Sequence, residues 1–169
     1  MPLVGRDSEI VVLDAGLEDA LGGRGRLFVV VGPPGSGKTR LGDEIASHAK
    51  ARGATILWGR AWDGGGAPRY WPWRQAMNDL PEPHGDGEDE RFRYFETVTD
   101  LLRTEAQRSP VMLVLDDLQA ADEDSLLLLE FVASEVAEMP MLIVGVARDG
   151  GPHLDELARV ATRTVQLGS

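Results

Sequence analysis

The sequence predicts an α/β fold in which a parallel sheet of five strands is covered by helices on both faces. Short segments that are apolar throughout alternate with longer segments whose apolar residues recur at helical spacing. A strand that is apolar on both sides is buried on both sides, as it is between two layers of helices. With 169 residues and 43% hydrophobic content, the chain is long enough for one domain with a substantial core.

The first four predicted elements follow from periodicity and from glycine. Residues 7–21 predict an amphipathic helix, which Gly22 and the glycines after it end. Residues 27–31 are Leu-Phe-Val-Val-Val and predict a central strand. After a glycine-rich loop, we expect a helix over residues 38–52 and a second strand over residues 54–59.

The middle of the chain is less regular. Residues 61–73 are rich in Gly, Pro and aromatic residues, and we expect an irregular excursion followed by a short helix over residues 73–80. Residues 81–90 are acidic and interrupted by Pro and Gly, which predicts a mobile surface loop. A helix over residues 91–108 and a third strand over residues 111–115 follow.

The last predicted elements are two helices and two strands. A helix is expected over residues 122–138, with Asp122 as its cap and with a buried side formed by Leu128, Phe131, Val132 and Val136. Strands over 141–146 and 163–167 flank a short helix over 154–160. Because the chain stops directly after the fifth strand, we expect residues 1–169 to be the N-terminal core domain of a larger multidomain protein.

Charge and composition argue against several classes of partner. Lys and Arg total 17 against 28 Asp and Glu, a net charge of −11 that disfavours direct binding to nucleic acid or to anionic lipid. The absence of cysteine excludes disulfides, thiolate metal sites and a cysteine nucleophile. The N-terminus lacks the features of a signal peptide, and the longest apolar stretches are too short to span a membrane. We therefore expect a soluble, cytoplasmic protein.

The segment between the first strand and the second helix carries the most specific motif. Its residues, Gly32-Pro33-Pro34-Gly35-Ser36-Gly37-Lys38-Thr39, match G-x-x-x-x-G-K-[S/T] at every fixed position. The glycines let successive N–H groups point inward around a phosphate, and the following helix adds the positive end of its dipole. In such a P-loop the lysine contacts the β- and γ-phosphates and the threonine hydroxyl can ligate Mg²⁺. The sequence thus predicts a site for ATP or ADP with Mg²⁺.

Two adjacent acids at the end of the third strand are the predicted partners of that loop. We assign Asp116 to the Mg²⁺ shell, because a carboxylate at the end of a neighbouring strand can reach the metal. Asp117 would then face the γ-phosphate, where it could orient or deprotonate a water molecule.

Arg148, at the end of the fourth strand, has two interpretations. It could sense or neutralise the charge of the γ-phosphate, or it could be a solvated arginine paired with Asp149.

The combination of motifs resembles the ATPase domain of STAND regulators, which are signal-transduction ATPases of the AAA-related superfamily. The likeness is nearest to the large ATP-binding LuxR-type transcription regulators of actinobacteria. Besides the P-loop, it is carried by residues 3–9, by Leu57 to Trp62, by Tyr70-Trp71-Pro72-Trp73 and by Leu113 to Asp122. The group commonly has His-Trp where this chain has Gln119-Ala120.

The resemblance implies several further properties. Val4, Gly5 and Arg6 would lie against the adenine and ribose, and Arg148 would be the sensor at the end of the fourth strand. The sheet order would be 5-1-4-3-2, with the lid domain absent from this chain, and the neighbours would be the protein's own C-terminal domains and further copies of itself. The predicted nucleotide-binding residues are Val4, Gly5, Arg6, Gly32, Pro33, Pro34, Gly35, Ser36, Gly37, Lys38, Thr39 and Arg40, with Thr39 and Asp116 at the metal and Lys38, Asp117 and Arg148 in catalysis.

The function predicted from these residues is a slow ATPase switch within a signalling or transcription-regulating protein. A small P-loop kinase and a nucleotide-binding interaction module without turnover are the alternatives. Two other features have structural interpretations that we prefer. Gly64-Gly65-Gly66 predicts a flexible loop. The aromatic residues Trp62, Tyr70, Trp71 and Trp73 could face a ligand, but we prefer a packed satellite core or a domain interface.

Overall fold

The computed structural model describes residues 6–151 and 154–168, which form a five-stranded, all-parallel sheet in the order β2-β3-β4-β1-β5. This order is the predicted 5-1-4-3-2 in reverse, so both the α/β fold class and the sheet order are confirmed. The strands are β1 (Arg26–Gly32), β2 (Thr55–Arg60), β3 (Val111–Asp116), β4 (Met141–Arg148) and β5 (Arg163–Gln166).

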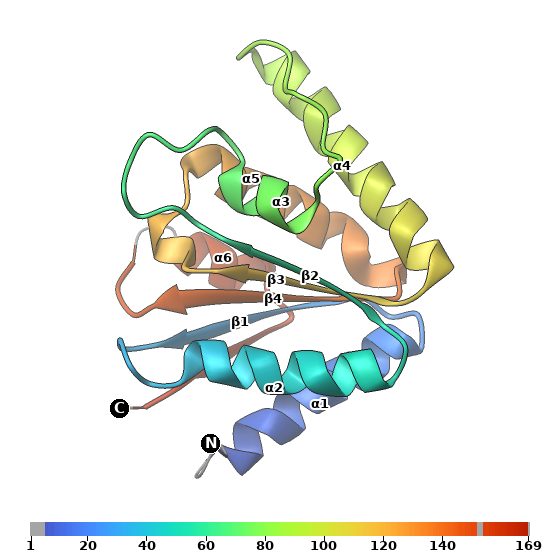
Figure 1. The fold of residues 1–169 in the computed structure, drawn as a ribbon, viewed down its shortest axis with the longest axis vertical. Coiled ribbons are helices and arrows are strands. Elements are labelled where there is room, and N and C mark those ends of the chain that lie inside the picture. The colour runs from blue at the N-terminus through green and yellow to red at the C-terminus, as the bar shows by residue number, and fades with distance from the viewer. Residues whose placement is uncertain (1–5, 152–153, 169) are drawn as a thin grey trace.

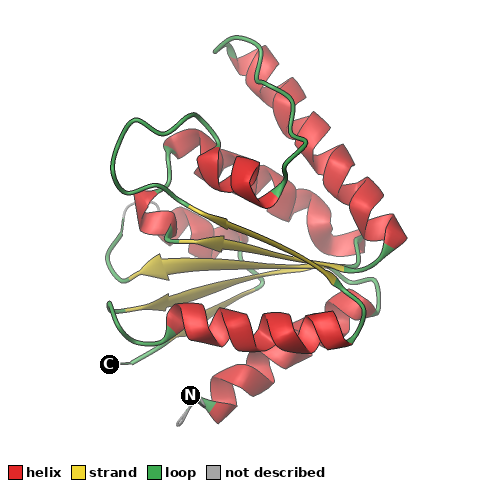
Figure 2. Ribbon diagram, in the orientation of Figure 1, coloured by secondary structure: helices red, strands yellow, loops and turns green. Residues whose placement is uncertain are grey.

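Helices cover both faces of this sheet, as Figures 1 and 2 show. Helices α1 and α2 lie on one face, and α3, α4, α5 and α6 lie on the other. Their bounds are α1 (Asp7–Leu21), α2 (Lys38–Ala51), α3 (Trp71–Ala76), α4 (Glu88–Arg108), α5 (Glu123–Glu135) and α6 (Leu154–Val160), with single 3-10 turns at Leu118–Ala120 and Val136–Glu138.

The core is divided by the sheet into two apolar clusters. On the α1 and α2 face, Leu13, Leu41 and Ile45 pack against strand residues such as Val30 and Val144. On the other face, the buried sides of α3, α4 and α5 pack against the alternate residues of the same strands. Strands β1, β3 and β4 are buried along nearly their whole length, which explains why they are apolar on both sides.

Helices α3, α4 and α5 differ from the prediction, and α5 ends at Glu135 with a 3-10 turn after it. Helix α4 starts at Glu88, inside the segment expected to be a loop, and Glu88, Asp89 and Glu90 form its first turn. Acidic residues are stabilised there by the positive end of the helix dipole, although the same composition is typical of a surface loop. Helix α3 covers Trp71–Ala76, because Pro72 fits the first turn of a helix and Met77 is already extended.

The aromatic segment is mostly part of the core, in agreement with its expected packing role. Tyr70 and Trp73 are fully buried, and the Tyr70 ring lies 4.8 Å from that of Tyr94. The Trp73 indole donates a hydrogen bond to the Ser125 carbonyl on α5, at 3.0 Å. Trp62 differs, because it is 55% exposed.

Helix α3 packs directly on β2 at a glycine. A Cβ atom on Gly59 would lie 1.8 Å from the Pro72 carbonyl oxygen, so only glycine permits this approach. The contact holds the following residue, Arg60, at the end of its strand, where its N–H also donates to the Gln75 side chain at 2.8 Å.

The register of the sheet brings four strand ends to one edge. Gly32 of β1 is aligned with Arg148 of β4, and Arg60 of β2 is aligned with Asp116 of β3. Ligands of open parallel sheets bind outside this carboxyl edge. The predicted site residues that follow or end these strands are therefore neighbours in space.

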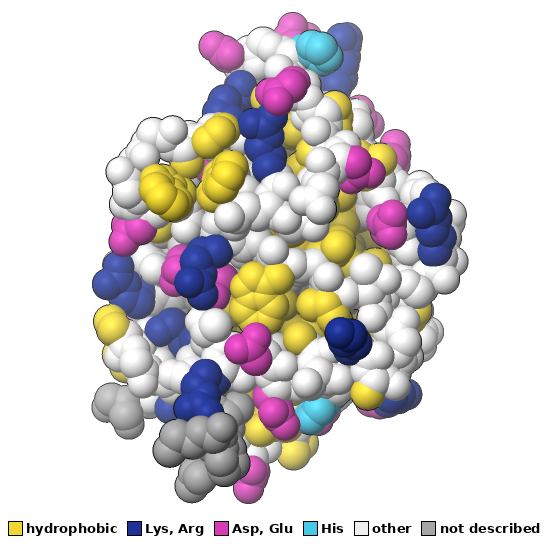
Figure 3. All heavy atoms as spheres, in the orientation of Figure 1, with side chains coloured by type: hydrophobic (Ala, Val, Ile, Leu, Met, Phe, Trp, Pro, Cys, Tyr) yellow, Lys and Arg dark blue, Asp and Glu magenta, His cyan; other side chains and the backbone are white. Residues whose placement is uncertain are grey.

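The described surface has no continuous basic area on the face drawn in Figure 3, where acidic and basic side chains are interspersed. None of the helices in the described ranges is long and apolar enough to cross a lipid bilayer.

Candidate functional site

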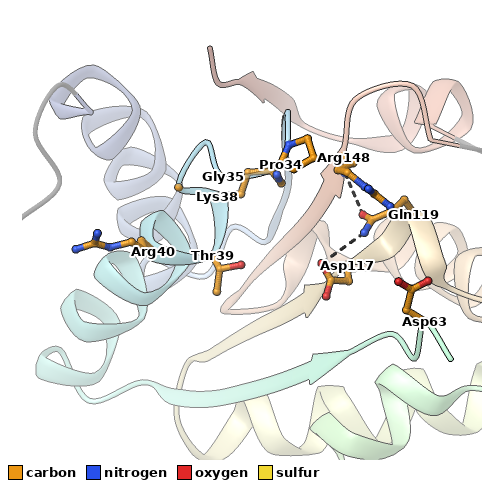
Figure 4. A pocket seen from close by; sticks show the side chains of 10 residues that line it. Pro34, Gly35, Lys38, Thr39, Arg40, Asp63, Asp117, Gln119 and Arg148 are labelled. Atoms are coloured by element: carbon orange, nitrogen blue, oxygen red, sulfur yellow. Dashed lines mark hydrogen bonds between the residues drawn. The ribbon is translucent and has the colours of Figure 1, made fainter. Parts of the chain in front are cut away.

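A cavity of about 510 Å³ opens at the carboxyl edge of the sheet, beside the glycine-rich loop (Figure 4). Its volume lies within the range typical of sites for small ligands. It is lined by Pro34, Gly35, Gly37, Lys38, Thr39, Arg40, Asp63, Asp117, Gln119 and Arg148. The structure therefore brings together residues from the loop, from the ends of β3 and β4, and from the segment after β2.

The loop has the backbone conformation that its glycines allow. Gly35 and Gly37 have φ values of 76° and 89°, and a Cβ atom added to either one would have no neighbour within 4 Å. The Lys38 ammonium group donates to the Pro33 carbonyl at 2.9 Å, so the lysine side chain lies along the loop. It would supply the positive charge that the loop offers to a phosphate. A loop of this kind can present N–H groups to a phosphate, and Lys38 lines the cavity beside it.

Asp116 is completely buried and is not one of the residues that line the cavity. Its Oδ2 atom accepts a hydrogen bond from the Thr39 hydroxyl at 3.1 Å, and its Oδ1 atom accepts one from the Asp117 N–H at 2.8 Å. The first turn of α2, which faces the cavity, is thereby connected to the end of β3. A hydroxyl oxygen and a carboxylate this close are the kind of oxygen donors that Mg²⁺ binds.

Asp117 points into the cavity and has an unusual backbone. Its φ of 56° is in the left-handed region, which few residues other than glycine adopt, although Asp and Asn adopt it more readily than most. Its side chain is 41% exposed, in contrast to the buried Asp116. The turn directs the two neighbouring carboxylates to different surroundings.

Arg60 is a cation that the sequence analysis did not single out. Its guanidinium lies 2.9 Å from Asp116 Oδ2 and 3.3 Å from Asp117 Oδ2. The hydrogen bond to Asp116 and the charge of that carboxylate raise the pKa of Arg60 above its ordinary value. The only signal in the sequence is an arginine at the end of an apolar strand, and its partner depends on the register between β2 and β3.

Gln119 is a second residue that sequence reasoning gave no role. Its side-chain oxygen accepts a hydrogen bond from the Arg148 N–H at 3.0 Å, and its amide nitrogen lies 3.5 Å from Asp117 Oδ1. Figure 4 shows the amide between these two residues. Gln119 therefore links the end of β4 to the acid after β3.

Arg148 is exposed and lines the cavity. The Asp149 carboxylate, its other proposed partner, accepts a hydrogen bond from the Gln166 side chain at 2.8 Å.

Arg6 makes contacts that its predicted role did not include. Its guanidinium donates to the Ser36 carbonyl at 2.9 Å and to the Gly168 carbonyl at 2.8 Å, joining the start of α1 to the loop and to the segment after β5. Val4 and Gly5 lie outside the described residues, so their predicted contact with the base stays a prediction. The Arg40 side chain points away from the other labelled groups in Figure 4.

The parallel sheet, the glycine-rich loop and the acids at its edge define a P-loop NTPase-like domain. The model of the AAA ATPase domain matches residues 2–144, and the chain belongs to this family. No curated protein matches the sequence.

Solved structures show the same fold at low sequence identity. Cdc6p from Pyrobaculum aerophilum matches with a TM-score of 0.69 and 21% identity, over 98% of this chain and 46% of that one. A chain of the HORMA:CdnC:Trip13 complex of E. coli MS115-1 matches with a TM-score of 0.65 and 15% identity, over 98% of this chain and 63% of that one. Rhizobiales Trip13 matches with a TM-score of 0.62 and 15% identity, over 98% of this chain and 62% of that one. The chain thus spans less than two thirds of these proteins.

Membership of this family implies a bound nucleotide and usually Mg²⁺. The residues present fit both groups. Among the described residues the buried Ser36 hydroxyl has no hydrogen-bond partner, and it belongs to the loop that would surround the phosphates. Lys38 lines the open cavity beside it, and the oxygens of Thr39 and Asp116 lie 3.1 Å apart at its base.

Proposed function

We propose that this domain binds ATP and ADP with Mg²⁺ and hydrolyses ATP slowly, as a switch. The observation that carries the proposal is the cavity at the sheet edge, in which the glycine-rich loop faces Asp117 and Arg148. The loop would supply N–H donors, Lys38 and Arg148 would supply positive charge, and Asp117 would supply a carboxylate. This combination is suited to a triphosphate.

Each residue of the site has a proposed task. Lys38 and the loop N–H groups hold the β- and γ-phosphates, and Thr39 with Asp116 holds Mg²⁺. The metal, when bound, offsets the negative charge of the phosphates. Asp117 accepts a proton from the attacking water. The water oxygen bonds to the γ-phosphorus as the bond between that phosphorus and the ADP oxygen breaks. Arg148 offsets charge on the departing phosphate.

We further propose that the switch works inside a signalling or transcription-regulating protein of the STAND type. This proposal is supported by the resemblance of residues 3–9 and of the segment Leu113 to Asp122 to that group. An exposed Trp62 beside the cavity-lining Asp63 offers a surface near the nucleotide from which its state can be sensed.

Phosphate release with and without candidate acceptors tests the proposed activity. We expect slow release of phosphate from Mg·ATP into water, and no increase when small hydroxyl-bearing metabolites are added. Transfer to an acceptor would instead identify a kinase, and tight binding without release would identify an interaction module.

Lys38→Ala is the matched variant for binding. The substitution removes the positive charge that would contact the phosphates, and the Lys38 side chain is not part of the core. Calorimetry with Mg·ATP should show that binding is lost, while circular dichroism shows an unchanged fold. A folded variant that binds with the affinity of the native chain would contradict the assignment of the loop.

A further inference from the structure

Arg60 brings a positive charge to the acidic pair through the register of the sheet. The residue ends β2, directly opposite Asp116 at the end of β3. Its fixed position follows from the preceding Gly59, where α3 packs on the strand. The fold therefore fixes the backbone of Arg60 beside Asp116, while its exposed side chain is free to rotate.

The oxygen that Arg60 contacts is also the oxygen that Thr39 contacts. Asp116 Oδ2 accepts from the Thr39 hydroxyl at 3.1 Å and from Arg60 Nη2 at 2.9 Å. A carboxylate oxygen has two lone-pair sites, and these two donors use both. The other oxygen, Oδ1, accepts the Asp117 N–H at 2.8 Å. A metal ion beside the Thr39 hydroxyl that uses Oδ2, directly or through a water ligand, must therefore displace one of these two donors.

Arg60 is the donor that can leave at the lower cost. Its side chain is 54% exposed, so the guanidinium can turn into solvent, whereas Thr39 is fixed in the first turn of α2. Its positive charge also repels a divalent cation placed at Thr39 and Asp116. Both effects act in the same direction and weaken metal binding.

We propose that Arg60 competes with Mg²⁺ for the Asp116 carboxylate and so raises the Mg²⁺ concentration at which the domain binds nucleotide tightly. This inference rests on the proposed function of the same site. When the metal binds, Arg60 releases Asp116 and keeps only its contact with Asp117 or with solvent. Arg60 is thus a positioning residue for the acids and a competitor of the metal.

The test compares native protein, Arg60→Gln and Arg103→Gln. Arg103 is the control, since it also pairs with an acid, Asp100 at 2.7 Å, and lies on α4 away from the cavity. Both variants lose one positive charge. The affinity for a fluorescent ADP analogue is measured over a series of free Mg²⁺ concentrations and in EDTA, and circular dichroism checks the fold.

The Mg²⁺ midpoint of Arg60→Gln is expected to fall about tenfold, the size expected from one charge-assisted hydrogen bond that the metal no longer has to break. The midpoint of Arg103→Gln and the affinity of Arg60→Gln in EDTA should match those of the native protein. An unchanged midpoint in Arg60→Gln would overturn the inference. So would a higher midpoint, which would place Arg60 among the groups that hold the phosphates.

A second measurement uses the metal alone and does not depend on nucleotide. Removing Arg60 leaves the buried Asp116 without its counter-charge, so Arg60→Gln should unfold at a lower temperature in EDTA and gain more from Mg²⁺ than the native protein does. Equal gains in the two proteins would reject the competition. Failure of the native protein to bind the ADP analogue would reject the proposed function, and this measurement would still decide the inference.

Discussion

Asp116 and Asp117 are neighbours in sequence, but their surroundings suit them to different tasks. Asp116 is completely buried and accepts hydrogen bonds from Thr39, Arg60 and the Asp117 N–H. Asp117 is partly exposed, lines the cavity and lies in a left-handed turn. A carboxylate surrounded by donors is suited to hold a metal shell, and a carboxylate open to the cavity is suited to accept a proton from water.

The two acids can therefore be separated by amide substitution. Asp117→Asn should bind Mg·ATP with native affinity but lose most hydrolysis, by about a hundredfold, since the amide keeps the shape and removes the basic oxygen. Asp116→Asn should weaken the Mg²⁺-dependent part of binding. Calorimetry and steady-state phosphate release measure the two effects. Native rates in both variants would show that the proposed division of tasks is wrong.

At the scale of the residue, the sequence predicted the parts of the site that are contiguous in the chain. The loop from Gly32 to Thr39 and the pair Asp116-Asp117 are local motifs, so one sequence suffices to find them. Arg60 and Gln119 are different, because their partners come from other strands. Their contacts depend on the register of the strands and on the direction of each side chain, and the spacing of residues along the chain predicts neither.

Helix α3 and strand β2 form a pair whose close approach depends on one glycine. The Pro72 carbonyl lies where a side chain on Gly59 would begin. Because the helix also carries Trp73 into the core, any shift of α3 disturbs the packing around that indole. The end of β2, with Arg60, moves with it.

Gly59→Ala should therefore destabilise the protein by about 3 kcal/mol, at the upper end of the usual cost of overpacking. Gly22→Ala is the control, because Gly22 has a φ of −83° and its nearest contact to an added Cβ is 3.5 Å. Urea unfolding monitored by tryptophan fluorescence compares the two variants with the native protein. Equal stability of both variants would show that α3 moves away from the strand at no cost.

At the scale of the element, the predictions failed where one composition suits two structures. The acids at the start of α4 are equally typical of a loop, and only their place at a helix N-terminus makes them favourable there. Strands β1, β3 and β4 were found within one or two residues because burial on both faces requires uninterrupted apolar segments. Their order came from family resemblance, since periodicity carries no information on which strands pair.

The stability of the whole molecule should depend on pH through His48, which joins the two helices of one layer. Its Nδ1 atom lies 2.8 Å from Asp14 on α1 and its Nε2 atom lies 3.3 Å from Glu44 on α2. The hydrogen bond to Asp14 is the main reason that the pKa of His48 is raised above its ordinary value of about 6.5. The charged ring is thus favoured in the folded state.

A raised pKa in the folded state gives stability that is fully present below about pH 6.5 and is lost as the pH rises through the folded-state value. The urea midpoint of the native protein should therefore fall more between about pH 6 and about pH 8.5 than that of His48→Gln. Other groups titrate alike in both proteins, so the difference between the two curves isolates His48. If the two curves of urea midpoint against pH are parallel, His48 does not contribute to the pH dependence of stability.

The pairing of β1 with β4 and β5 has a consequence for the synthesis of this protein on the ribosome. The first strand emerges early, but both of its neighbours in the sheet come from the far end of the chain. Chains emerge from the N-terminus, and contacts between distant segments must wait for the later one. The growing polypeptide therefore carries its glycine-rich loop, without the sheet that shapes it, until translation of these 169 residues is nearly complete. Nucleotide cannot stabilise the nascent chain before that point.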